Sequence, residues 1–409
     1  MPLARTSLFA LALCVALAAC APPDPIFVGG SARGGAPASV PHAIESSSGF
    51  AASTHSPDPA NASADPAEQA LRDACGQNDA ALVRVASALV QDSTSADHVD
   101  VDSLAYELRA AGAPYVWPRA WRFDGPERQL EAAKSRMQAW LASFGDGSLR
   151  RCGVALARGP TAHISVFAIA VDALADLEPV PTRVRVGQWL DLRAELHVPA
   201  EAAKLVVLGP RGAPHAVPST LDQGHFAARF NADHEGQYLV QVLAAVAGGP
   251  RPLLEALIFA GVEPPAKFQL EKAPGEDRAN NADPRAALYE MVNEARASER
   301  VAPLARAPQL EALAQAHAEA MRRAQQTAHD AGDGDLVQRL ANAGLELRAG
   351  ENVAHAGNAA LAQRALWASP SHRENLLFPD YDALGIGVAP DPDGTLWVCE
   401  VFADWPGGS

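Results

Sequence analysis

Three side chains in the last third of the sequence are of types that could act together in one chemical step. They are His329, Glu351 and His372. Glu351 lies in the segment GENVA at 350–354, and His372 lies in SPSHRENLL at 369–377. Imidazole and carboxylate groups accept protons and bind divalent metals such as zinc. Function is therefore to be sought where these residues meet.

His372 is expected in the first turn of a helix. Ser369 can cap a helix whose first residue is Pro370, a residue well tolerated at that position. The positive end of the helix dipole disfavours an imidazolium ion, so we expect a neutral His372 that can accept a proton or bind a divalent metal. The alternative is that His372 hydrogen-bonds the backbone of a neighbouring loop.

The other two side chains are expected on connecting segments. Glu351 is predicted where a loop enters a helix, a place at which a carboxylate can orient an imidazole or complete a metal shell. His329 is predicted on the polar, glycine-containing loop 327–334. His317 instead falls in the apolar stripe of a predicted helix, which indicates a hydrogen-bonded core histidine.

These motifs resemble the bacterial branch of the CAP (SCP/PR-1-like) superfamily. That family's pattern runs His, GEN, Trp, SPxHRxNL and a GxGV strand, matched here also by Trp367 and by GIGV at 385–388. The resemblance implies an α-β-α sandwich over residues 283–407, with a cleft lined by His329, Glu351 and His372. It also implies a divalent metal such as zinc, held by the two histidines with Glu351.

The chain departs from the family pattern at one place. The wider superfamily often has a second glutamate just after the tryptophan, but Ala368, Ser369 and Pro370 follow Trp367 here. Glu374 and Glu400 are the candidates to approach the cleft in place of this second glutamate. The sequence also contains no Gly-x-Ser-x-Gly motif, and Cys399 lies in the apolar run 396–399, where a buried free thiol is expected.

The first residues predict export and a lipid anchor. Arg5 precedes a short apolar run that ends in LAAC at 17–20, which is typical of a signal peptide with a lipobox over residues 1–20. Cys20 would then carry the lipid and attach the protein to the membrane, with Ala21 favouring the outer membrane. An ordinary signal peptide is the alternative. Residues 21–68 are rich in Ala, Pro, Ser and Gly and predict a disordered tether.

Two further domains are expected before the CAP-like one, and together the three give an α+β protein. Short apolar runs separated by Gly and Pro predict an immunoglobulin-like β-sandwich over residues 180–263, followed by a linker over 264–282. Residues 69–177 predict a helical α+β domain. Its sequence can be aligned with the CAP-like region by matching Gly153 to Gly387. This alignment suggests a degenerate copy of the CAP-like domain that lacks the site. The alternative is an unrelated helical α+β fold.

The net charge limits the possible partners, and the cysteines suggest one disulfide. A net charge of −15 and the lack of a basic run argue against nucleic acid. Cys75 and Cys152 fall in one predicted domain, so an oxidising envelope would allow them to pair.

The interpretation that we favour is an envelope lipoprotein whose CAP-like domain binds a peptide, glycan or lipid. The alternative is a metal-dependent hydrolase in which Glu351 activates water between His329 and His372. Lipid or sterol carriage rests on family analogy alone.

Overall fold

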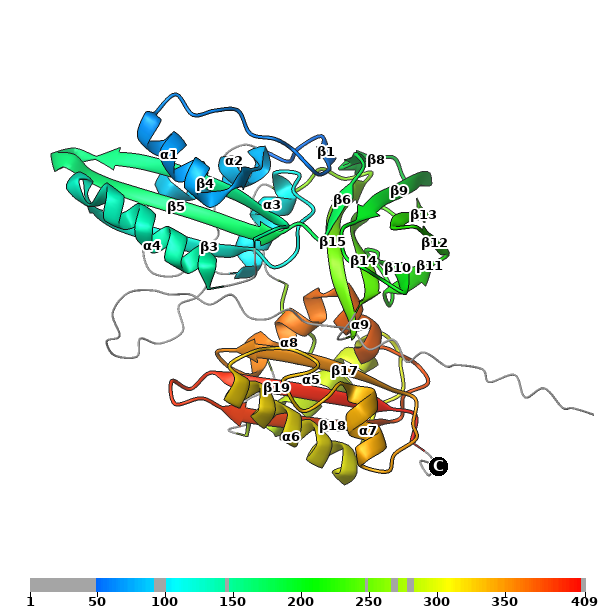
Figure 1. Cartoon of the computed structure of the whole chain (residues 1–409). Coiled ribbons are helices and arrows are strands. Elements are labelled where there is room, and N and C mark those ends of the chain that lie inside the picture. The colour runs from blue at the N-terminus through cyan, green and yellow to red at the C-terminus, as the bar shows by residue number, and fades with distance from the viewer. Residues whose placement is uncertain are drawn as a thin grey trace, which may run out of the picture.

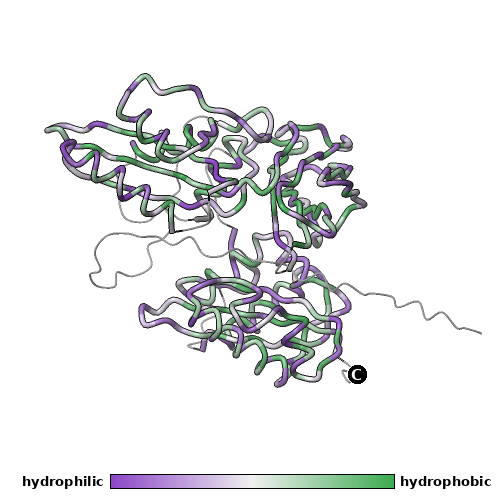
Figure 2. Tube along the Cα trace, in the orientation of Figure 1, coloured by the Kyte–Doolittle hydropathy of each residue, from purple (hydrophilic) through white to green (hydrophobic). Residues whose placement is uncertain are grey.

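The computed structural model describes residues 49–91, 101–143, 147–246, 249–265, 271–277 and 283–405. It confirms an α+β protein built of three domains (Figure 1). The hydrophobic residues run along the central strands of each domain (Figure 2). The predicted signal peptide, Cys20 and most of the tether lie outside the described residues. Among the helices that are described, none has the length and hydrophobicity needed to cross a membrane.

The C-terminal domain has one four-stranded sheet in the order β16-β18-β19-β17. Its strands pair antiparallel except for β16, which runs parallel to β18. The strands are β16 (Ala305–Arg306), β17 (Ala349–Ala356), β18 (Ala383–Pro390) and β19 (Leu396–Ala403). The helices are α5 (Pro284–Ser298), α6 (Pro308–Ala324), α7 (Leu336–Asn342), α8 (Ala359–Ala368) and α9 (Pro370–Leu376).

Helices cover both faces of this sheet, as an α-β-α sandwich requires. Leu310 of α6 packs with Val353 and Val401 on one face. On the other face, Leu288 of α5 packs with Phe402 and with residues of α8. Asp283 caps the start of α5, because its side chain accepts a hydrogen bond from the backbone N–H of Arg285 at 3.0 Å.

The middle domain is a β-sandwich of two sheets, in the orders β11-β10-β14-β15-β8 and β12-β13-β9-β6. The Tyr238 hydroxyl hydrogen-bonds the backbone of His234 four residues upstream, which resembles the tyrosine corner of immunoglobulin-like sandwiches. The strands are β6 (Ala175–Leu177), β8 (Arg183–Val184), β9 (Gln188–Leu196), β10 (Ala202–Leu208), β11 (His215–Val217), β12 (Ser219–Asp222), β13 (His225–Ala232), β14 (Gly236–Val246) and β15 (Gly249–Ala260).

The N-terminal domain has the same topology as the C-terminal one. Its sheet runs β2-β4-β5-β3, again with only the first pair parallel. Its helices also occur in the corresponding order along the chain. The elements are α1 (Pro66–Cys75), β2 (Gln77–Asn78), α2 (Ala80–Gln91), α3 (Val101–Ala110), β3 (Arg119–Pro126), α4 (Leu130–Ala142), β4 (Arg150–Gly159) and β5 (His163–Asp172).

A close contact between helix and strand fixes the register of the two copies. A Cβ added to Gly153 would lie 2.1 Å from the backbone carbon of Leu82 in α2, and one added to Gly385 would lie 2.1 Å from that of Leu310 in α6. The strand pairings give the same equivalence. Gly153 therefore corresponds to Gly385, and the predicted match to Gly387 was displaced by two residues.

Two links, one covalent and one through the backbone, hold the first half of the molecule together. A disulfide joins Cys75 at the end of α1 to Cys152 in β4. Strand β1 (Ser53–Thr54) pairs with β7 (Val180–Pro181) beside the sandwich, and Thr54 is buried. The predicted tether over 21–68 therefore extends too far, because its last part is held by strand pairing.

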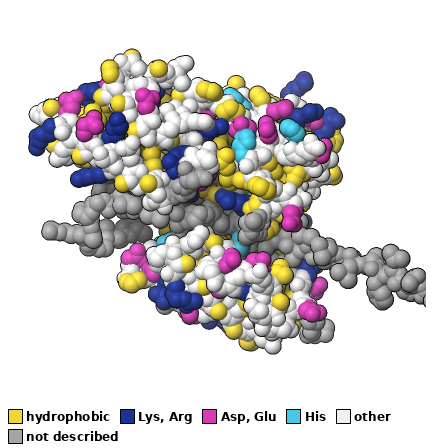
Figure 3. All heavy atoms as spheres, in the orientation of Figure 1, with side chains coloured by type: hydrophobic (Ala, Val, Ile, Leu, Met, Phe, Trp, Pro, Cys, Tyr) yellow, Lys and Arg dark blue, Asp and Glu magenta, His cyan; other side chains and the backbone are white. Residues whose placement is uncertain are grey.

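The sandwich contacts both other domains. Toward the N-terminal domain, Glu255 of β15 pairs with Arg109 of α3. Toward the C-terminal domain, Lys204 of β10 pairs with Glu374 of α9 at 2.8 Å. Basic and acidic side chains are interspersed on the face shown in Figure 3.

Candidate functional site

Glu351 lies in strand β17, not at the start of a helix as its sequence neighbourhood suggested. Residues 349–356 pair antiparallel with β19 and place Glu351 opposite Val401. Its side chain is fully buried. Such a carboxylate must find its partners inside the protein, because burying an unpaired charge is very costly.

Both oxygens of Glu351 are engaged. Oε1 accepts a hydrogen bond from Nδ1 of His329 at 2.5 Å. Oε2 pairs with the guanidinium of Arg339 in α7 and lies 3.3 Å from the Sγ of Cys399. Burial alone would raise the pKa of Glu351, but the hydrogen bond from His329 and the charge of Arg339 lower it to about 2. Glu351 is therefore a carboxylate at neutral pH.

His329 lies on the predicted loop between α6 and α7 and is nearly buried. Arg339 fixes this loop, because its Nη1 donates to the backbone carbonyls of His329 at 2.7 Å and Gly334 at 2.6 Å. Sequence reasoning missed Arg339. The available signal was its place in a short helix between Leu336 and Leu340, both of which are buried.

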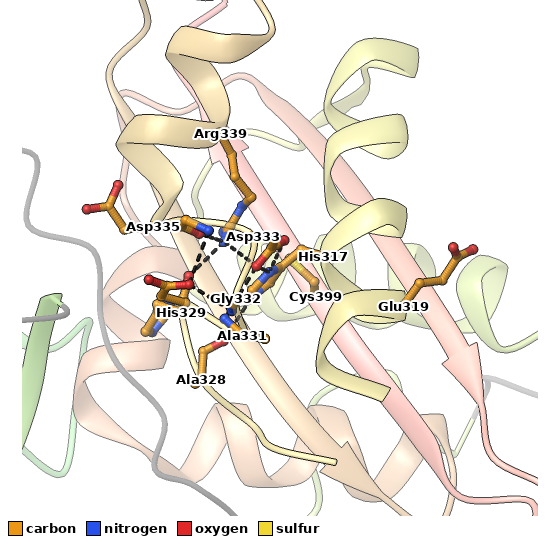
Figure 4. Close-up of polar contacts among 12 residues, drawn as sticks. His317, Glu319, Ala328, His329, Ala331, Gly332, Asp333, Asp335, Arg339 and Cys399 are labelled. Atoms are coloured by element: carbon orange, nitrogen blue, oxygen red, sulfur yellow. Dashed lines mark hydrogen bonds and ion pairs between the residues drawn. The ribbon is translucent and has the colours of Figure 1, made fainter. Parts of the chain in front are cut away.

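His317 lies beside this cluster and is fully buried (Figure 4). Its Nδ1 hydrogen-bonds Asp333 at 2.9 Å, and its Nε2 hydrogen-bonds the backbone carbonyl of Ala328 at 2.9 Å. With both ring nitrogens occupied, His317 is the hydrogen-bonded core histidine that its place in the helix predicted. It holds the loop that carries His329.

A second polar cluster lies on the opposite face of the sheet, around Asn352. Its Nδ2 donates to Glu400 Oε2 and to the backbone carbonyl of His372, each at 3.2 Å. Asn375 of α9 in turn donates to Asn352 Oδ1 at 3.0 Å and to the backbone carbonyl of Glu351 at 3.1 Å. Asn375 thus ties the GEN segment to the SPSHRENLL segment.

His372 lies in the first turn of α9, as predicted, and is 7% exposed. The predicted capping is wrong, because the Ser369 side chain makes no capping hydrogen bond. Burial lowers the pKa of His372 to about 3, and the electrostatic interaction with nearby His329 adds to this shift. The ring is thus neutral, with desolvation as the main cause. Neither ring nitrogen has a partner among the described residues.

The two substitutes for the missing second glutamate take different positions. Glu374 points to the sandwich and pairs with Lys204. Glu400 is fully buried behind Asn352, and burial raises its pKa to about 8. Only Glu400 therefore belongs to the polar centre of the domain.

Gly350 shows why the GEN segment begins with glycine. A Cβ at this position would lie 2.7 Å from Oδ1 of Asn375 and 2.8 Å from the hydroxyl of Tyr381. Any side chain here would displace the amide of Asn375 and the hydroxyl of Tyr381 from their places against β17. The glycine thus permits the close approach that builds the second cluster.

A metal fits this centre only in part. Where the structure is described, no three His, Cys, Asp or Glu side chains form a group that could hold an ion. His329 and His372 are close enough to interact electrostatically, and a neutral imidazole such as His372 is a metal ligand. Glu351 already pairs with Arg339 and hydrogen-bonds His329, so it would orient this histidine rather than bind the metal directly. The residues fit a two-histidine site with a carboxylate in its outer shell.

Comparison with known proteins identifies the domain. Residues 289–401 match the family described as "CAP: Cysteine-rich secretory protein family". The C-terminal domain is a CAP domain. No curated protein matches the chain.

Solved structures of bacterial proteins are similar to parts of this chain. An outer surface protein from Borrelia burgdorferi is 21% identical, over 31% of this chain and 95% of that one, with a TM-score of 0.29. An extracellular protein containing an SCP domain from Bacillus anthracis is 15% identical, over 57% and 86%, with a TM-score of 0.28. A cysteine-rich secretory protein from Staphylococcus aureus is 14% identical, over 57% and 84%, with a TM-score of 0.27.

The N-terminal domain has the topology of the CAP domain without its polar centre. Strand register sets Glu351, Asn352 and Glu400 against three residues of the first copy. These residues are Ala120, Trp121 and Ala168. The helix register that aligns Leu82 with Leu310 also replaces His317 by Leu89. Apolar side chains thus fill the place of the site.

Proposed function

We propose that this protein is an envelope or extracellular binding protein whose CAP domain holds its ligand beside His372. The observation that carries this proposal is the His372 ring, which is buried while both ring nitrogens lack a partner among the described residues. Buried polar atoms normally have partners, so a bound molecule can supply them. The ligand class is a peptide, glycan or lipid.

Binding is a better account than hydrolysis because of the state of Glu351. A general base must be free to take a proton at the working pH. Glu351 is paired with Arg339 and hydrogen-bonded by His329, and its pKa is about 2. Its geometry suits the orientation of His329 rather than the activation of water.

A divalent metal such as zinc is part of the proposal. His329 and His372 would bind it, with Glu351 fixing the tautomer of His329 from behind. When bound, the ion would supply a Lewis acid for a carbonyl, phosphoryl or hydroxyl oxygen of the ligand. The protein residues would orient the ligand and exclude water.

Calorimetric titration of zinc into the full chain tests the metal. His372→Ala should abolish zinc binding and leave the fold nearly intact, since no hydrogen bond from the ring is lost. His225→Ala is the matched control, because His225 lies exposed on β13 of the sandwich. Equal zinc affinity in wild type and His372→Ala would remove the metal and leave a binding domain without one.

The proposed location rests on the LAAC segment at 17–20, with membrane attachment through a lipid on Cys20. Processing at this segment would place the mature protein outside the cytoplasmic membrane. Cys20→Ser should release the protein from the membrane fraction of the producing cell. Unchanged partitioning of the variant would disprove lipidation.

A further inference from the structure

Three buried side chains on the α8 and α9 side of the CAP sheet have polar atoms without a hydrogen-bond partner among the described residues: Gln363 of α8, His372 of α9 and Glu400 of β19. Glu400 is fully buried, and its Oε1 has no hydrogen-bond partner in the described part of the chain. The same holds for Nδ1 and Nε2 of His372, which is 7% exposed. A buried polar group without a hydrogen-bond partner destabilises the folded state. Such a destabilisation calls for an explanation in terms of a bound molecule.

One amide group holds Glu400 and His372 together. Asn352 Nδ2 lies 3.2 Å from Glu400 Oε2 and 3.2 Å from the backbone oxygen of His372. Asn375 fixes the orientation of Asn352 by donating to its Oδ1 at 3.0 Å. With one oxygen occupied by Asn352, Glu400 has only Oε1 to offer to a ligand. The position of that oxygen is therefore set by three side chains from two strands and a helix.

When no metal is bound, the charges around the pair select a neutral ligand group. Arg296 and Arg373, the arginines on α5 and α9 that lie on this side of the sheet, donate to backbone carbonyls, of Leu376 and Trp367 respectively. Lys204 is paired with Glu374. These described cations are thus already committed and do not offer a free charge to an anion. The raised pKa of Glu400, about 8, keeps this carboxyl group protonated at neutral pH, so it offers an O–H donor and attracts no cation.

We propose that Glu400 and His372 form a subsite for an uncharged amide group of the ligand, as in a peptide backbone. In the metal-free protein the amide carbonyl accepts a hydrogen bond from the Glu400 carboxyl, and the amide N–H donates to the one acceptor nitrogen of the neutral imidazole, the same nitrogen that would otherwise bind zinc. An amide suits two separate partners because it carries its donor and its acceptor on different atoms. The subsite deepens the proposed binding function on which it rests, since it names the chemical group that is held beside His372.

Glu400 is the second buried carboxyl group in the polar centre of the domain, after Glu351. In this chain the second acidic group comes from β19 and points to the α8 and α9 side of the sheet. Glu351 lies on the other face and is neutralised by Arg339. The two carboxyl groups are therefore in different protonation states and serve different partners.

Acetamide is the probe for this subsite. The full chain, freed of metal with a chelator and labelled with 15N at its histidines, is titrated with acetamide and in parallel with acetate, and the ring nitrogens of His372 are assigned from their loss in His372→Gln. We expect acetamide to shift these signals and acetate to leave them unchanged. Glu400→Leu should raise the apparent Kd for acetamide about tenfold, as expected for one lost hydrogen bond. Glu400→Gln should keep near-normal binding, because its amide replaces the O–H donor.

Glu374→Leu is the matched control, since it removes a glutamate that points to the sandwich, and its acetamide affinity should equal that of wild type. Three results would overturn the subsite: no response to acetamide, an equal response to acetate, or Glu400→Gln as weak as Glu400→Leu. Failure of acetamide binding with zinc binding intact would remove the subsite alone. If wild type binds acetamide but not zinc, the metal site is disproved and the subsite is retained.

Discussion

Glu351 and Asn352 are neighbours in the chain, but their side chains point to opposite faces of the CAP sheet. Glu351 meets His329 and Arg339, whereas Asn352 meets Glu400 and the backbone of His372. Alternation along a strand produces this division without any other device. A single dipeptide therefore organises both halves of the polar centre, and a shift of β17 by one residue would exchange them.

Removal of Arg339 should destabilise the CAP domain strongly. In Arg339→Met the buried Glu351 loses its neutralising charge, and breaking a buried ion pair from one side costs about 3–5 kcal/mol. The free energy of unfolding from urea denaturation measures the effect. Arg348→Met is the control, because the Arg348–Asp380 pair is exposed and should contribute about 0–1 kcal/mol. Equal losses in the two variants would contradict the role given to Arg339.

Glu400 should make stability fall as the pH rises. Its pKa is about 8 in the folded protein and 4.5 ordinarily, so the folded state holds the proton more tightly. The stabilisation is complete below pH 4.5 and disappears as the pH rises through 8. Relative to Glu400→Gln, which does not titrate, wild type should lose roughly 3–5 kcal/mol over this window. A pH-independent difference between the two proteins would show that Glu400 is already ionised.

Replacing Gly153 of the N-terminal domain by alanine should destabilise that domain. Gly153→Ala would force a Cβ into the backbone of α2, at 2.1 Å from a carbon of Leu82, and should cost about 3 kcal/mol or more. Gly159→Ala in the same strand is the control, since its nearest contact would be an ordinary 3.8 Å. Thermal melting of both variants decides. Similar melting temperatures would mean that α2 does not pack on β4 as described.

Reduction should weaken the N-terminal domain selectively. The Cys75–Cys152 disulfide closes a segment with a sequence separation of 77 residues, and loss of such a bond typically costs about 2–5 kcal/mol. We expect the transition of the first domain to move down in reductant while that of the CAP domain stays in place. A Cys75→Ser/Cys152→Ser double variant should not respond to reductant. A response in that variant would show that the reductant acts on the protein by a route other than this disulfide.

Much of the CAP domain could be predicted because its signals are local. The capping of α5 by Asp283, the buried stripe of α6 and the GIGV strand all follow from periodicity and helix-start chemistry. His317 could be assigned to the core for the same reason. The sandwich followed from short alternating runs, and the copy in the first domain from a faint similarity that strand register then aligned.

The errors arose where long-range packing decides. Glu351 follows a glycine and seemed to begin a helix, but pairing with β19 made it part of a strand. The neutrality of His372 was assigned to the helix dipole, whereas burial dominates. The only local sign of Arg339 is its place between two buried leucines, and Glu400 has none, because the partners of these residues are 12 and 48 residues away along the chain.

Helix α9 is only seven residues long, yet it has two attachments on different sides. His372 points into the CAP domain, and two residues later Glu374 holds Lys204 of the sandwich. A rigid helix transmits displacement from one side to the other, so a molecule that moves His372 also pulls on β10. A ligand that displaced His372 would therefore also displace the partner of Lys204, and we expect such a ligand to change the distance between the CAP domain and the sandwich.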